Sequence, residues 1–446
     1  MLLKNTLKLM LLVTLIFSSV SIVNAQYLLN SDSAFNAGAA NSGRLWGYMF
    51  GDYYVKTHSD ALNRGGSNQY TGIPKDRNAF AFRRIYLGYD YNISKKFSAE
   101  LLLAAEDNFP GFNGPTSSST TGDELLNNKL TFYIKLANIR WKNIWKGTDF
   151  VFGQLSTPTF PLLTEKIWNY RSVERTITDI RRTPSYDFGG SLQGVFDPAT
   201  KNFGYNVLIA NGTSAKPASN SFKWLYGDVY AYLFDKKVVL DLYADYLRTN
   251  WSPIPSQERS RQMVKGYIAY NSAATAKGGM NPGQGYTVGV EVFANNLKND
   301  LFATKIAGGV DTINNVATGA SFYVHGDIIK NKLRFFTRVD LYNPMKKINN
   351  NVYKNYVGNT GNYNDDEFLL AYNNNGSPVS ATKLGDETYK QTFFLAGLDY
   401  MPTKNVHLEP NIWYNHYATQ LSGQSGAATG DHDMVLRLTF FYVFGK

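Results

Sequence analysis

The stretch MVLRLTFFYVFGK (Met434–Lys446), which ends the chain, decides between the possible folds. Every second residue belongs to one apolar set: Leu436, Leu438, Phe440, Tyr442 and Phe444. The residues between them form a mixed set: Arg437, Thr439 and Phe441. A period of two is typical of a β-strand, because successive side chains of a strand point to opposite faces. The sequence therefore predicts a final strand with one apolar face and one face that accepts charge.

About sixteen segments between residues 44 and 446 alternate in the same way, and eighteen are possible. In residues 333–342, for example, Leu333 and Val339 share one face while Arg334, Arg338 and Asp340 share the other. Glu100 on residues 97–106, with Asp241 and Asp245 on residues 238–245, also lies opposite an apolar face. By this count Arg83 falls on the apolar face of its strand, which places it near a rim or indicates a shift in the count.

The connectors between these segments alternate in length. Short turns are expected at residues 92–96, 197–202, 234–237, 328–333 and 401–405, and long polar loops at 57–79, 106–129, 159–184, 249–261, 295–317 and 345–391. All short turns then lie at one end of the sheet, as in outer-membrane barrels with short periplasmic turns and longer extracellular loops. A closed barrel also satisfies every backbone group within the bilayer. We therefore expect an all-β fold, a transmembrane antiparallel β-barrel over residues 44–446.

The beginning of the chain resembles a secretory signal peptide. Lys4 and Lys8 precede the apolar run LMLLVTLIFSSV, and small residues at Val23 and Ala25 place cleavage before Gln26. The apolar run is shorter than the roughly 20 residues that a spanning helix needs. We expect residues 1–25 to be removed, which lowers the formal charge from +10 to +8, and residues 26–43 to precede the barrel. The expected location is the cell outer membrane.

Few residues indicate catalysis or a cofactor. The chain has no cysteine, which excludes disulfides and thiolate metal sites. Its five histidines, His58, His325, His407, His416 and His432, match no HxxxH or HExxH pattern. The acidic stretch NYNDDE (362–367) lacks the spacing of a calcium loop. We expect no cofactor, no metal, no nucleic-acid partner and no enzymatic activity, although an outer-membrane hydrolase and an adhesin with a binding loop at 345–391 stay open as alternatives.

The loop over residues 159–184 differs from the others because it has apolar anchors and helical spacing in its middle. The anchors are Phe160, Leu162, Leu163, Ile167, Trp168 and Ile177. Its basic residues are Lys166, Arg171, Arg175, Arg181 and Arg182, and its acids are Glu165, Glu174 and Asp179. The barrel lumen is the available place to bury the anchors. Folded inward, the loop would narrow the channel and favour anions at the constriction, unless its arginines face water or pair with its own acids.

Several patches resemble the phosphate-selective porin O and P family, in the style of members from the Bacteroidota. They are FGQLSTPTFP, NYRSVER and IRRTPSYDFGGSLQGVFD around this loop, FRRIYLGYDYNISKKFSAEL near the start, YNVLIANGTS in the middle and AGLDYMPTKNVHLEPNIWY near the end. The resemblance implies a 16-stranded outer-membrane barrel, commonly a trimer in the lipid, whose third extracellular loop folds into the pore. It also implies that Arg171, Arg175, Arg181 and Arg182 contribute to anion selection.

The sequence departs from the basic pattern of the phosphate-selective members, because acidic residues accompany the basic ones in the loop and on the wall. Lys166 and Glu174 join the four arginines as constriction candidates, and the expected lumen wall mixes both signs: Lys135, Arg334, Arg338 and Arg437 with Glu100 and Asp340. A barrel of about 16 strands leaves an aqueous lumen. The sequence thus predicts a porin, a passive diffusion channel for small anionic or neutral hydrophilic solutes, with at most a mild anion preference.

Overall fold

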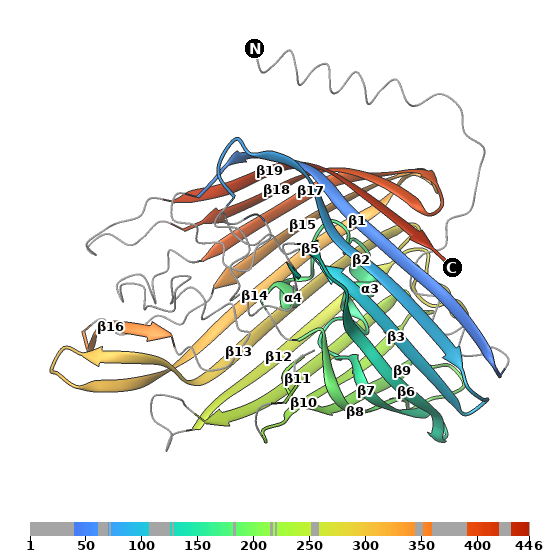
Figure 1. Ribbon diagram of the computed structural model, residues 1–446, viewed down its shortest axis with the longest axis horizontal. Helices are drawn as coiled ribbons and strands as arrows, with labels where there is room; N and C mark the ends of the chain where they lie inside the picture. The colour runs from blue at the N-terminus through green and yellow to red at the C-terminus, as the bar shows by residue number, and fades with distance from the viewer. Residues whose placement is uncertain are drawn as a thin grey trace, which may run out of the picture.

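Sixteen antiparallel strands of the computed structural model pair side by side until the last returns to the first, which closes a barrel (Figure 1). The structure describes residues 40–60, 70, 73–106, 125–126, 129–181, 184–214, 217–218, 221–250, 258–343, 351–358, 390–418 and 430–445. The predicted signal peptide, the acidic stretch 362–367 and most of residues 345–391 lie outside these ranges.

The barrel strands follow one another in chain order around the ring. They are β1 (Ser42–His58), β2 (Asn78–Asn92), β3 (Phe97–Glu106), β6 (Tyr133–Trp145), β7 (Thr148–Ser156), β8 (Tyr186–Val195), β9 (Phe203–Ala210), β10 (Trp224–Leu233), β11 (Val238–Asn250), β12 (Glu258–Asn271), β13 (Tyr286–Lys305), β14 (Val310–Ile329), β15 (Leu333–Asn343), β17 (Gln391–Thr403), β18 (Val406–Tyr417) and β19 (Asp431–Phe444). The short elements are the pair β4 (Leu125–Leu126) and β5 (Lys129–Leu130), β16 (Tyr353–Gly358), α3 (Thr164–Trp168) and α4 (Ile177–Ile180). The predicted class and strand number are confirmed.

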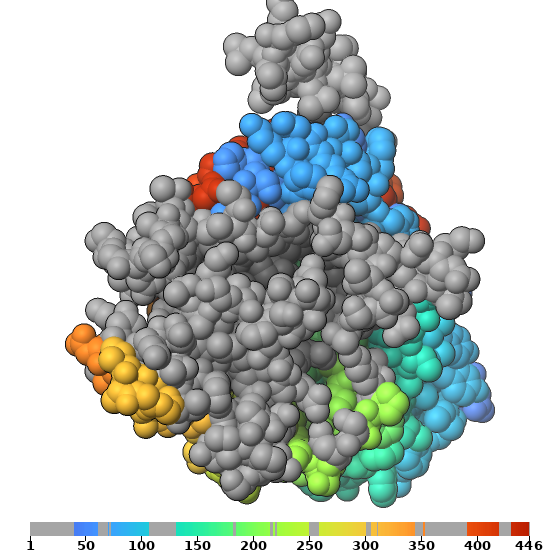
Figure 2. Space-filling view, turned by 60° about the vertical axis from the view of Figure 1, so that its left-hand side comes forward, coloured from blue at the N-terminus to red at the C-terminus, as the bar shows by residue number. Residues whose placement is uncertain are grey.

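The terminal strand closes the barrel. β19 pairs with β1 over most of its length, with Arg437 opposite Tyr54 and Phe440 opposite Gly51. Figure 2 shows the blue residues near the start of the barrel beside the red residues near its end. In β19, Leu436 and Leu438 are exposed on the outside, whereas Arg437 and Thr439 are buried inside. The two faces of the opening stretch are therefore as the alternation predicts, and the same holds for residues 333–342.

A bulge explains the position of Arg83. The register between β1 and β2 shifts at Phe50 and Gly51, so Arg83 has no partner of its own in the ladder. A bulge breaks the alternation of a strand, and Arg83 and Arg84 consequently both point inward, where both are buried. The parity count thus shifts within β2, and Arg83 does not lie on the apolar outer face.

The predicted long connector at residues 295–317 is wrong. β13 and β14 continue through this region to a tight turn after Lys305, with Leu301 opposite Ile313. β16 adds to the other edge of β13, where Phe302 is opposite Val357. These three strands project beyond the barrel as a small sheet (Figure 1). In such a projection both faces meet water, so the sequence lacks the apolar face that identifies a membrane strand.

The connector between β12 and β13 is longer than the other short turns because it also fills part of the barrel end. Asn271 donates to the carbonyl oxygens of Asn281 and Gln284, which folds the connector back on itself. Met280 in this turn is buried among aromatic side chains that face inward. Among the described residues, no helix is long and apolar enough to cross a membrane.

Candidate functional site

Residues 157–181, here called the lumen segment, run inside the barrel and carry α3 and α4 (Figure 1). Five of their apolar side chains are fully enclosed, since Phe160, Ile167, Trp168, Val173 and Ile177 are at most 1% exposed, whereas the predicted anchor Leu162 is half-buried. Such burial stabilises the inward position, because each large apolar side chain removed from water contributes about 1.5–3 kcal/mol. Local signals shape the helices: Thr176 caps α4 by accepting from the Asp179 amide, and Asn169 ends α3 with a left-handed backbone.

Hydrogen bonds attach the lumen segment to the wall of β11–β18. The indole of Trp413 donates to Glu174 at 2.7 Å, Ser172 donates to Glu409 at 3.0 Å, and Arg181 donates to Gln391 at 2.7 Å. Further contacts reach the same wall: Thr159 to Tyr243, Lys265 to the Thr159 carbonyl, Thr178 to Glu291 and His325 to the Ile167 carbonyl. On β2, three strands beyond β18 around the ring, Arg83 also donates to the Ser172 carbonyl at 2.7 Å.

Three of the predicted lumen-wall arginines face inward but lie beneath other parts of the chain. Arg338 pairs with Asp340 and donates to the Arg175 carbonyl. Arg334 donates to the carbonyls of Gly283 and Pro282 in the β12–β13 connector. Arg437 donates to Asn411 and Tyr70. These three guanidinium groups are 4% exposed or less and hold structure together, so they do not line open space.

The acids of the lumen segment pair with its own arginines. Arg171 lies 3.1 Å from Glu165 and 3.2 Å from Asp179, and Arg175 lies 3.9 Å from Asp179. Burial raises the pKa of Glu165, and Arg171 only partly opposes this shift. Burial acts on Asp179 too, but there Arg171 and Arg175 together lower the pKa. Glu174 also has a lowered pKa, because Arg175 and Arg83 outweigh its burial.

A cavity of about 290 Å³ separates the lumen segment from the wall of β1–β8. Its lining includes Trp46 and Asp90 near the short-turn end and Tyr86 nearer the middle of the barrel. The lumen segment therefore makes most of its hydrogen bonds to β11–β18 and leaves space along part of β1–β8. Seven charged side chains line this space: Lys135, Arg140, Lys166 and Arg171, with Asp90, Glu100 and Glu165.

The structure thus separates the predicted residues into two groups. Lys135, Lys166, Arg171 and Glu100 line the cavity, where the Lys135 ammonium lies 2.5 Å from Glu106 and 5.0 Å from the ring centres of Tyr86 and Tyr186. Arg175, Arg181 and Glu174 are anchored in buried contacts, and Arg182 lies outside the described residues. Arg140 also lines the cavity but was not among the predicted residues, although its alternation with Ile139 and Trp141 places it on the inner face.

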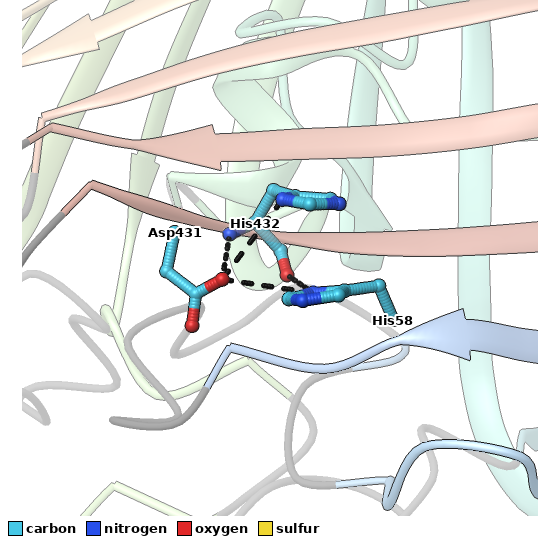
Figure 3. Close-up of side chains that lie close together, drawn as sticks. All are labelled: His58, Asp431 and His432. Atoms are coloured by element: carbon cyan, nitrogen blue, oxygen red, sulfur yellow. Dashed lines mark hydrogen bonds and ion pairs between the residues drawn. The ribbon is translucent and has the colours of Figure 1, made fainter.

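A group of potential metal ligands lies at the end of the barrel that carries the long loops, where the end of β1 meets the start of β19 (Figure 3). His58 Nδ1 lies 3.6 Å from the Asp431 carboxylate and 2.7 Å from the His432 carbonyl oxygen. The imidazoles of His58 and His432 stack with their centres 3.9 Å apart and their planes 12° apart. Lone pairs of stacked rings run parallel and do not converge, so this arrangement favours a contact that joins the two strands.

The fold has known counterparts. The chain is similar to the outer membrane channel DcaP of Acinetobacter baumannii, with a TM-score of 0.56 and 12% identity over 91% of this chain and 98% of that one. It is also similar to an anion-selective porin from Comamonas acidovorans, with a TM-score of 0.50 and 12% identity over 91% of this chain and 100% of that one. No protein-family model matches the chain, and no curated protein matches its sequence. At this identity the likeness establishes a shared barrel fold.

Proposed function

We propose that this protein is a porin, a passive diffusion channel for small hydrophilic solutes. The observation that carries the proposal is that the lumen segment attaches mainly to β11–β18, which leaves a charged cavity along β1–β8. A closed barrel of sixteen strands leaves an aqueous interior, and the lumen segment reduces its cross-section. The two similar structures, a channel and an anion-selective porin, support the same function.

The charge of the cavity supports a mild anion preference. Four basic and three acidic side chains line it, and one of the acids, Glu165, has a pKa raised by burial. Arg171 and Lys135 are the basic groups proposed to act on a passing ion, because they line the cavity from its two sides, Arg171 on the lumen segment and Lys135 on β6. A balance so close to neutrality argues against strict selection of phosphate, which the resemblance to the O and P family would imply.

The outer membrane is the location that fits this function. The outward-facing side chains are apolar along the strands, as with Leu242 and Leu341, which are 64% and 55% exposed. A lipid-facing band of this kind characterises outer-membrane barrels. We further propose a trimer, and native mass spectrometry of the detergent-solubilised protein will detect it as a species of three times the chain mass.

Conductance tests the channel. Purified protein added to a planar bilayer in potassium chloride should produce stepwise current increases, and a salt gradient should give a reversal potential of the sign that indicates anion preference. An absence of steps would overturn the porin proposal, and a cation-selective potential would overturn the role of Arg171. An adhesin instead predicts that deletion of residues 345–391 abolishes binding of a partner while conductance is unchanged. A hydrolase predicts turnover that a single substitution of Asp431 removes.

A further inference from the structure

The cavity beside the lumen segment has an aromatic wall. Trp46 and Tyr48 of β1 lie with their ring centres 6.3 Å apart and their planes 15° apart. Tyr48 also lies 4.5 Å from Tyr86 of β2. Trp46 and Tyr48 are only half-buried although they point inward, so part of each ring meets the cavity. These rings offer a flat aromatic surface along one side of the space.

A glycine allows the indole to take this position. Trp46 is directly opposite Gly88 on β2, and the indole lies over the glycine. A methyl group at residue 88 would come within 2.3 Å of Cε2 of Trp46, a distance at which the ring must move. The identity of residue 88 therefore determines where the aromatic surface stands.

Three of the residues that line this cavity carry buried hydrogen-bond donors without partners. Among the described residues, Nε1 of Trp46, Nδ2 of Asn169 and Nη1 of Arg171 are buried and have no hydrogen-bond acceptor. All three residues line the same space. Buried donors are normally paired with protein or with ordered water, so these three require acceptor atoms that the chain does not supply. Such acceptors are the oxygens of water or of a solute.

We propose that this cavity binds small aromatic carboxylates during their passage. The ring of the solute packs against Trp46 and Tyr48, and its carboxylate accepts from Arg171 and Asn169. Inorganic phosphate would satisfy the donors but leave the aromatic surface without contact. A neutral sugar would carry no negative charge to pair with the basic side chains of the cavity. The cavity volume of about 290 Å³ is close to the lower end for small-molecule sites, roughly 300 Å³. This inference rests on the channel proposed above and names its solute class.

Block of single channels by benzoate tests the proposal. Benzoate added in the millimolar range should interrupt the potassium chloride current in a concentration-dependent way, whereas phosphate and glucose should not. Trp46→Ala should weaken the block about tenfold, which corresponds to the loss of one aromatic contact. Arg171→Gln should weaken it at least as much. Trp46→Phe keeps an aromatic ring and should retain most of the block, and Gly88→Ala should weaken it by displacing the indole.

The controls keep a failure of binding distinct from a failure of conduction. Trp145→Ala removes an exposed aromatic residue that does not line the cavity, and it should leave the block unchanged. Calorimetric titration of the detergent-solubilised protein with benzoate requires no conduction. Intact conductance without benzoate binding would overturn this inference alone, while benzoate binding without conductance would overturn the channel. Equal block of the Trp46→Ala variant, or block by phosphate that exceeds block by benzoate, would overturn the aromatic site.

Discussion

The indole nitrogen of Trp413 donates a 2.7 Å hydrogen bond to the carboxylate of Glu174, and the two residues are 239 positions apart in the chain. Both are buried, with Trp413 on β18 and Glu174 in the lumen segment. This bond fixes the middle of the segment to β18, none of whose residues lines the cavity. The width of the open space therefore depends on a contact that lies outside it.

Trp413→Phe should loosen the lumen segment, because the ring still packs while Glu174 loses a donor. A buried acceptor left without its partner costs about 1–3 kcal/mol. We expect larger fluctuations of the open-channel current and a shifted mean conductance in single-channel recordings. Trp145→Phe, an exposed position, serves as the control. A current trace of Trp413→Phe identical to that of the unchanged protein would show that this bond does not hold the segment.

Arg338→Met should lower the stability of the whole barrel. Its guanidinium pairs with Asp340 and supports the Arg175 carbonyl, and the side chain is 1% exposed. Removing one member of a buried pair leaves the other charge uncompensated, which costs about 3–5 kcal/mol. The measurement is heat- or denaturant-induced unfolding in detergent. Because the loss comes from the stranded Asp340, the double variant Arg338→Met with Asp340→Leu should recover part of it.

Arg171→Gln should reduce anion preference more than Arg181→Gln. Arg171 lines the cavity, whereas Arg181 lies 3.8 Å from the ring centre of Tyr342 and donates to Gln391. An ion in the cavity can contact the Arg171 guanidinium directly, whereas other side chains separate it from the Arg181 guanidinium. Reversal potentials in a salt gradient measure the difference, with the exposed rim residue Arg248→Gln as a matched control. Equal shifts for Arg171→Gln and Arg181→Gln would contradict this placement.

Anion preference should rise as the pH falls from 7 toward 5. The pKa of Glu165 is raised above its ordinary value, mainly by burial, so its protonation begins at a higher pH than that of an exposed glutamate. Protonation removes a negative charge 3.1 Å from Arg171. Asp179 has a lowered pKa and stays ionised through this window. Reversal potentials at each pH provide the measurement, and Glu165→Gln should show the low-pH preference already at pH 7.

The alternation of side chains allowed the barrel strands to be predicted from sequence because each crosses a boundary between lipid and water. Strands that extend beyond the membrane have no lipid-facing side, so alternation does not identify them. Residues 301–305 and 310–313 form the ends of β13 and β14 that project beyond the barrel, and they appear as loop residues in the sequence. Arg83 illustrates a different limit, since a single bulge reverses the inward and outward faces beyond it.

The inward position of the lumen segment was predictable from its apolar anchors, but the strands of the wall to which it attaches were not. Arg334, Arg338 and Arg437 carry the correct strand parity, yet parity alone does not reveal that other segments cover them. The choice of wall depends on pairs such as Arg181 with Gln391, which are 210 positions apart. No short-range pattern encodes such pairs. For the same reason the cavity and its aromatic wall emerge only from the assembled barrel.

The attachment of the lumen segment to the last strands also has a consequence for assembly. Its hydrogen-bond partners on β17 and β18 follow it by more than two hundred residues, so they are synthesised and exported after it. Contacts of such long sequence separation form late in folding, because the loop-closure entropy is lost before they can compensate for it. We expect the segment to attach to the wall only when the last strands close the ring. The assembling barrel then passes through a stage with a wider lumen than that of the folded protein.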